Sequence, residues 1–233
     1  VYASQRRRGG AVPSVLAISA SFGNSVQIGI PMASALFGEP GLAIHITVVS
    51  LHALVLLSVA TTLVELDLAR EAGRSSLRET LLLTLRNTVI HPVVLPVVAG
   101  LLFNAAGGTL PAAVDEALVM LASAVVPVCL VLIGVSLATY GLGGRTRGGT
   151  AVIVIKLLVL PAGVLAFGHW GLGLAGLPLA VVVMMSAMPV GSNALIFAQR
   201  YGTLEAEATG SIVISTVAFA FTAPLWLALL ARL

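Results

Sequence analysis

Long apolar runs separated by short polar breaks make up almost the whole chain. A helix needs about 20 apolar residues to cross a bilayer, so the pattern predicts seven membrane-spanning helices. These helices cover residues 12–37, 41–64, 88–105, 114–139, 151–170, 174–199 and 207–230. The first break, Gly-Glu-Pro-Gly at 38–41, has the residues of a tight turn. The longest polar stretch, 65–79, is expected to be a solvated loop or surface helix.

Composition supports a membrane protein and excludes a soluble domain. Only 9% of the residues are charged, whereas soluble domains carry about 25%. The mean hydropathy is +1.09. With so few charges, the net charge of +3 reports membrane topology and does not indicate a nucleic-acid partner.

The basic residues predict the orientation of the chain. If the N-terminus is cytoplasmic, eleven of the twelve Lys and Arg residues lie on or near the cytoplasmic side, and only Arg232 lies outside. We therefore expect a multi-pass protein of the plasma membrane with a cytoplasmic N-terminus and an external C-terminus. Seven-helix receptors have the opposite polarity, so this count argues against a receptor.

Two of the predicted helices are interrupted by Gly, Pro, Ser and Asn near their middle, at 21–31 and 186–193. Pro removes a helical hydrogen bond and Gly favours unwinding. Within a membrane, such a break is tolerated only where protein or a wet cavity covers it. A half-helix that begins there points its positive N-terminus at the membrane centre, where it can hold an anion. Ordinary proline kinks packed against neighbouring helices are the alternative.

Several motifs resemble the auxin efflux carrier family, which includes plant PIN-formed auxin exporters and bacterial malate and malonate permeases. Asn24-Ser25-Val26-Gln27-Ile28-Gly29-Ile30-Pro31, closing at Phe37-Gly38, is similar to the asparagine-centred signature of its first broken helix. Met188-Pro189 through Tyr201-Gly202 is similar to its second broken helix. The resemblance runs from about residue 15 to the end.

This resemblance implies a fold of ten helices in two inverted repeats of five, with the substrate at the crossing of the two broken helices. The chain would supply helices 4–10 and lack the first three. Residues 1–66 would end the first repeat, 67–86 would be a cytoplasmic linker, and 87–233 would form the second repeat.

The resemblance also implies candidate site residues. Asn24 matches the family's crossover asparagine and Pro189 its second crossover proline. Gly23 stands where plant members have a proline, so the first break is expected to depend on Gly23 and on Pro31. From their positions at the breaks, the predicted substrate-binding residues are Asn24, Ser25, Gln27, Ser192 and Asn193, and the predicted crossover residues are Gly23, Gly29, Pro31, Pro189 and Gly191.

Other polar residues within the spans have two interpretations each. His52 is a candidate for proton coupling, although a histidine hydrogen-bonded inside the bundle fits equally, and His45 fits a hydrated or hydrogen-bonded position. Lys156 can extend toward the aqueous interface, or it can attract an anion to the cytoplasmic mouth. Trp170 and Trp226 are placed as expected for an interfacial aromatic belt.

The function predicted from these patterns is a secondary carrier for a small organic anion such as a carboxylate, working by alternating access. The alternative is a truncated membrane subunit or fragment that does not transport. An intramembrane enzyme is not expected, because the chain has no His-Glu-x-x-His motif, no Gly-x-Ser-x-Gly motif and no pair of intramembrane aspartates. We expect no metal and no cofactor, and the coupling ion, H⁺ or Na⁺, stays open. A homodimer is compatible with the sequence.

Overall fold

Helices form nearly all the regular structure of the computed structural model, which describes residues 11–71, 94–140 and 149–233. The helices are α2 (Val12–Ser21), α3 (Gly29–Glu71), α5 (Val94–Ala105), α6 (Ala112–Tyr140), α7 (Gly149–Val154), the π-helix η1 (Ile155–Val159), α8 (Leu160–Ala166), the π-helix η2 (Phe167–Gly171), α9 (Gly176–Ala187), α10 (Asn193–Arg200) and α11 (Glu205–Leu230). The basic N-terminal residues and most of the predicted linker 67–86 lie outside the described residues.

Three of these helical stretches are long and apolar enough to cross a membrane, among the residues that the structure describes. They are Gly29–Leu68, Gly149–Gly171 and Glu205–Leu230, while α2 and α9 are shorter apolar helices. The protein is therefore an all-α membrane protein, as the hydrophobic pattern predicts. The total of seven spans and their arrangement in inverted repeats stay predictions.

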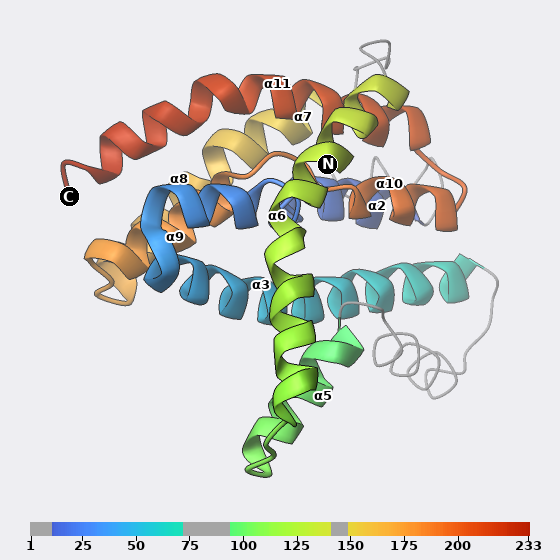
Figure 1. Ribbon diagram of the computed structural model, residues 1–233. Coiled ribbons are helices and arrows are strands. Elements are labelled where there is room, and N and C mark those ends of the chain that lie inside the picture. The colour runs from blue at the N-terminus through green and yellow to red at the C-terminus, as the bar shows by residue number, and fades with distance from the viewer. Residues whose placement is uncertain (1–10, 72–93, 141–148) are drawn as a thin grey trace.

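The tight turn expected at 38–41 lies within α3. Gly38 has φ 63° and ψ −164°, a left-handed backbone region that favours glycine, and the two parts of α3 run in different directions on either side of it. Figure 1 shows the first part continuing from α2 beyond the break and the longer second part running back beneath α2 and α10.

The second part of α3 has one buried face and one exposed apolar face. Leu51, Val55 and Val59 follow a four-residue spacing and are each at least half exposed. Ala53, Leu57 and Val64 lie on the opposite face and are buried against α2 and α10. This arrangement is expected of a helix that packs with one stripe and presents the other to hydrocarbon.

The polar stretch from residue 65 is not simply solvated, so the sequence prediction was wrong for its first residues. α3 continues through Glu71. The Tyr201 hydroxyl donates a hydrogen bond of 3.1 Å to Glu65 Oε1, and Asp67 is 1% exposed. The carboxylate of Glu65 therefore joins the end of α3 to the end of α10.

Two clusters of buried apolar residues hold the bundle together. One lies among α2, α3, α10 and the start of α11. The other lies among η1, α8, α9 and the later part of α11. α6 runs across the other helices from beside α11 to beyond α3, and the short helix α5 lies beyond α3 (Figure 1).

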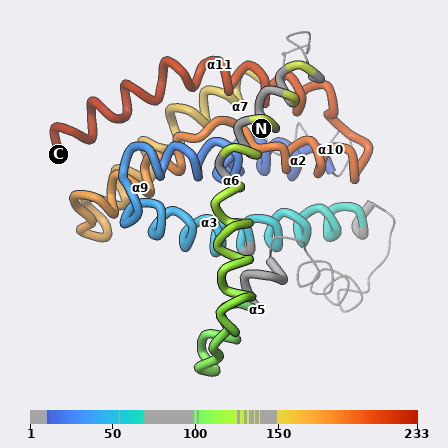
Figure 2. The backbone as a smooth tube through the Cα atoms, viewed as in Figure 1, coloured from blue at the N-terminus to red at the C-terminus, as the bar shows by residue number. Residues whose placement is uncertain are grey.

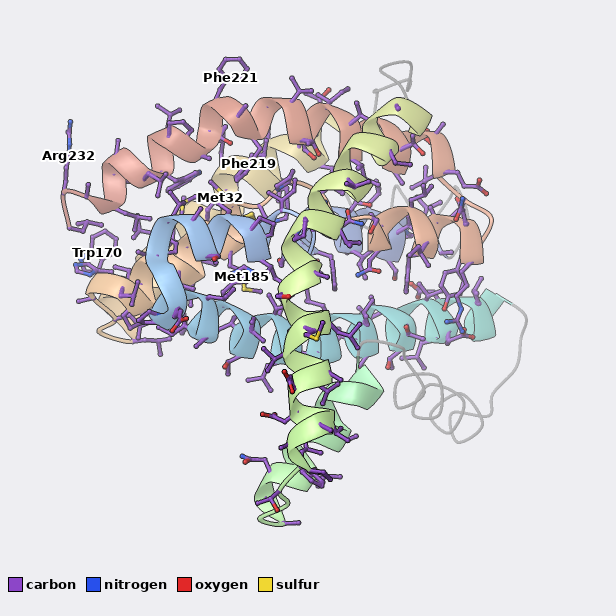
Figure 3. All side chains as sticks on the ribbon, in the orientation of Figure 1. Met32, Trp170, Met185, Phe219, Phe221 and Arg232 are labelled. Atoms are coloured by element: carbon purple, nitrogen blue, oxygen red, sulfur yellow. The ribbon has the colours of Figure 1, made fainter. Side chains whose placement is uncertain are left out.

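The side chains at the outer surface are largely apolar, as a lipid-facing surface requires. Trp170 and Phe221 point away from the bundle and are 76% and 73% exposed, whereas Met185 and Phe219 point into it (Figure 3). Trp226 is buried, and its Nε1–H donates a 2.9 Å hydrogen bond to the Leu157 carbonyl. The expectation of an aromatic belt is therefore wrong for Trp226.

Candidate functional site

The two predicted breaks are real, and their backbones cross. α2 ends at Ser21 and α3 begins at Gly29, while α9 ends at Ala187 and α10 begins at Asn193. Between them, Gly23 and Val190 form an antiparallel bridge. The Asn24 N–H donates to the Pro189 carbonyl at 2.8 Å, and the Gly191 N–H donates to the Phe22 carbonyl at 3.0 Å. The backbone is thus extended at both breaks, which a simple proline kink would not produce.

The surrounding helices pair further backbone groups that the breaks release. The Val190 N–H donates to Ser215 Oγ of α11 at 3.0 Å, and Ser215 is fully buried. The Lys156 ammonium donates to the Ser186 carbonyl at the end of α9. Unpaired backbone groups in hydrocarbon cost several kcal/mol each, so these two side chains stabilise the break in α9–α10.

Glycine is required where the two breaks touch. A Cβ atom added to Gly191 would lie 2.8 Å from the Gly23 carbonyl oxygen and 3.2 Å from the Asn24 nitrogen. A Cβ atom added to Gly23 would lie 3.1 Å from the Met188 Cβ. The two breaks therefore approach at the observed distance because Gly23 and Gly191 lack side chains.

The other predicted crossover residues flank the contact. Pro189 contributes its backbone carbonyl, as described above. Pro31 lies in the first turn of α3, after the break, where its missing N–H removes no helical hydrogen bond that the first turn needs. Gly29 leaves room for His45, whose Nε2 would lie 2.6 Å from an added Cβ.

A cavity of about 200 Å³ opens beside the crossing. Its lining comes from the two breaks and from the second part of α3. The residues are Phe22, Gly23, Asn24, Ser25, Val26, Gln27, Val49, His52, Ala53, Gly191, Ser192 and Asn193. All five residues predicted to bind substrate are among them.

The Asn24 side chain shapes the first break. Its Oδ1 accepts a hydrogen bond from the Gln27 N–H at 3.2 Å, and its Nδ2 donates to Gln27 Oε1 at 3.1 Å. The Asn24 carbonyl also accepts from the N–H groups of Ile28 and Gly29. Asn24 therefore folds the chain into the turn that leads to α3 while its amide lines the cavity.

The second break presents the start of α10 to the cavity. α2 and α10 lie side by side, and the crossing lies where each meets its break (Figure 2). The carbonyl of Ser192 accepts from the Leu195 and Ile196 N–H groups, which starts the helix. Within the described part of the chain, the side chains of Ser192 and Asn193 form no hydrogen bond with the protein, and both are partly exposed. The positive end of α10 and two polar side chains thus face the cavity together.

Comparison with known families agrees with this architecture. Residues 8–227 match the membrane transport protein family. The chain belongs to this family. A search of curated proteins gives no match, so a closer likeness to an auxin exporter or a malate permease stays a prediction. Transport families move solutes and do not transform them, which is consistent with the absence of catalytic motifs from the sequence.

The two histidines of α3 have different surroundings. His45 is 1% exposed, and its Nε2 lies 2.7 Å from the Ser25 carbonyl oxygen. It therefore supports the first break from within the bundle, which agrees with the hydrogen-bonded position that the sequence allows. His52 lines the cavity, with its ring centroid 5.2 Å from that of Phe22. A proton-coupling role for His52 stays a prediction.

The position of the Lys156 side chain differs from both positions that the sequence predicts. Its side chain is 0% exposed, so it does not extend toward an interface or stand at a cytoplasmic mouth. It lies in η1, and its Nζ donates a 2.5 Å hydrogen bond to the Ser186 carbonyl oxygen. The only sequence signal for this position is a single lysine within an apolar run.

Sequence reasoning also missed two supporting residues. Ser215 has no distinguishing feature in the sequence, since small hydroxyl residues are common in membrane helices. The hydrogen bond of Trp226 to η1 depends on a π-helical turn that no pattern in the sequence predicts. Among the described residues, no group of three His, Cys, Asp or Glu side chains is placed to hold a metal ion.

Proposed function

We propose that this transporter is a secondary carrier for a small organic anion, which binds in the cavity at the crossing of the two breaks. The single observation that carries the proposal is the cavity itself, because its polar lining comes from both breaks at once. A ligand held there contacts α3 and the start of α10 simultaneously, so its binding depends on how the two elements are placed. This dependence is the requirement for coupling binding to a conformational change.

The size of the cavity supports a small solute. Sites for drug-sized ligands measure about 300–1,000 Å³. The cavity of about 200 Å³ fits a ligand of few heavy atoms, or one part of a larger molecule. Malonate, malate and the acetate arm of an indole acid are all of this small size.

The polarity of the cavity supports an anion. Asn24, Gln27 and Asn193 supply amide donors, and Ser25 and Ser192 supply hydroxyl groups. The N-terminus of α10 adds its positive partial charge. No Asp or Glu lines the cavity among the residues described. A carboxylate would therefore find donors without a repelling charge.

Alternating access and topology complete the proposal. The crossing would carry the ligand between two faces of the membrane while one group of helices moves against another. We propose a plasma-membrane location with the N-terminus in the cytoplasm, on the basis of the basic residues. The inverted-repeat boundaries 1–66, 67–86 and 87–233 belong to the same proposal.

Uptake into proteoliposomes tests this function. Radiolabelled malonate, malate and indole-3-acetate are offered to vesicles that contain the native chain, Asn24→Ala or Asn104→Ala. Asn104 is an exposed residue of α5 and provides the matched loss of an amide. We expect uptake of at least one carboxylate by the native chain and by Asn104→Ala, and a reduction of tenfold or more in Asn24→Ala. Equal uptake by both variants would contradict a site at the crossing.

A further inference from the structure

Lys156 places a buried positive group beside the crossing, outside the set of residues that line the cavity. Its side chain is fully buried, and its one hydrogen bond within the described residues joins Nζ to the Ser186 carbonyl oxygen at 2.5 Å. An ammonium group has three N–H donors. Its hydrogen-bonding capacity is therefore only partly used by the protein.

This ammonium lies against Gly23, one of the residues that line the cavity. A Cβ atom built on Gly23 would lie 3.2 Å from Lys156 Nζ and 3.4 Å from its Cε. Gly23 itself lines the cavity. The charge thus lies directly behind the cavity wall.

The backbone around Lys156 is held in an unusual conformation. Residues Ile155–Val159 form one π-helical turn within an otherwise α-helical stretch. The Trp226 Nε1–H donates to the Leu157 carbonyl at 2.9 Å and fixes this turn against α11. Single π-helical turns are found frequently at functional sites. The direction in which Lys156 points is therefore set by the fold.

The ammonium has no negative partner among the residues that the structure describes. Among the residues described, no Asp or Glu forms an ion pair with Lys156. A buried charge without a partner is costly, and interactions between charges are strong where water is excluded. An anion in the cavity would supply the missing negative charge at short range.

We propose that Lys156 determines the charge specificity of the crossing site, by favouring a ligand that carries a carboxylate over a neutral ligand of the same shape. This inference rests on the proposed function, since it assumes that ligand binds in the cavity. Lys156 acts as a positioning charge behind Gly23. It does not need to touch the ligand.

The test compares carboxylates with their neutral amides. Binding of malonate and malonamide, and of indole-3-acetate and indole-3-acetamide, is measured by calorimetry on the whole chain in lipid nanodiscs. Lys156→Gln removes the charge but keeps an N–H donor for the Ser186 carbonyl. Lys156→Met removes both, and Lys156→Arg keeps the charge. Arg232→Met removes one positive charge at the exposed C-terminal end.

We expect the native chain, Lys156→Arg and Arg232→Met to prefer a carboxylate over its amide. In Lys156→Gln and Lys156→Met, this preference should fall by about tenfold or more, while affinity for the amide stays within about twofold. If Lys156 had only a structural role, its replacement would weaken the binding of the carboxylate and of the amide equally. The ratio of carboxylate affinity to amide affinity is measured on each variant that shows native-like thermal unfolding. The two neutral variants differ in size. If one of them misfolds, the other still provides the test.

Two negative results have different meanings. If either folded neutral variant keeps the native carboxylate preference, the inference about Lys156 is overturned and the proposed carrier function stands. If the native chain binds none of the carboxylates, the proposed function itself is contradicted. An equal loss of carboxylate and amide binding would assign Lys156 a structural role and would also overturn the inference.

Discussion

At the scale of single residues, the crossing depends on two glycines, which have no Cβ atom. Gly23 and Gly191 allow two extended backbones to touch within a helical bundle, because neither carries a side chain. The sequence indicates this need, since both glycines lie within the predicted breaks. It does not indicate which glycine tolerates a methyl group, because that depends on the atoms of the other break, which lies far away in the chain.

Gly191→Ala should destabilise the protein. The new Cβ atom would meet the Gly23 carbonyl oxygen at 2.8 Å, and a backbone oxygen cannot move aside as a side chain can. We expect a loss of about 1–3 kcal/mol, the usual cost of overpacking a well-packed site. Thermal unfolding in detergent, followed by circular dichroism, measures it.

Gly163→Ala is the matched control for this prediction. Gly163 lies in α8, and an added Cβ would meet no atom within 4 Å. Alanine favours helix over glycine by roughly 0.5–1 kcal/mol, so this variant should be as stable as the native chain or more so. Equal destabilisation by the two substitutions would show that the close approach at Gly191 does not limit stability.

At the scale of elements, each break needs a neighbouring helix that pairs its backbone. Proline and glycine in an apolar run predict where helices are interrupted, and α2 and α9 end, and α3 and α10 begin, close to the predicted breaks. The residues that support the breaks were not predicted. Ser215 and Lys156 act from other helices, and side-chain direction between helices cannot be read from hydrophobic periodicity alone.

Ser215→Ala tests the support that α11 gives to the second break. The substitution leaves the Val190 N–H without its partner in a fully buried place. A buried donor without an acceptor costs about 1–3 kcal/mol, and we expect this loss of unfolding free energy. Thr216→Val is the control, because its hydroxyl bonds only to the Ile212 carbonyl of its own helix. Similar losses in the two variants would assign no special role to Ser215.

At the scale of the whole molecule, the hydrophobic pattern predicts the class well and the arrangement less completely. All-α membrane architecture and the meeting of Asn24 with Pro189 both agree with the sequence interpretation. The buried positions of Asp67 and Trp226 and the hydrogen bond that Glu65 accepts do not, because charged and aromatic residues at span ends are ambiguous between surface and interior. Tertiary contacts decide between the two.

A single cysteine placed in the cavity tests whether a carboxylate binds at this site. The chain has one native cysteine, so Ser192→Cys is made together with Cys129→Ser. A membrane-impermeant thiol reagent should label position 192 in proteoliposomes. A saturating carboxylate at about ten times its Kd should slow labelling about tenfold, because the occupied fraction is protected. Labelling that is unchanged by every carboxylate in the panel would exclude binding at this position.

The hydrogen bonds between the breaks have a consequence for biosynthesis. Asn24 and Pro189 are about 165 residues apart in the sequence, yet the N–H of the first and the carbonyl of the second pair directly. At a translation rate of about 5–20 residues per second, the second break is completed roughly 10–30 s after the first. During this interval the first break enters the insertion pathway without the second break, with which it pairs in the finished protein. Its polar backbone must be hydrated or held by the insertion machinery until the second break arrives, so the folding of this transporter is completed late.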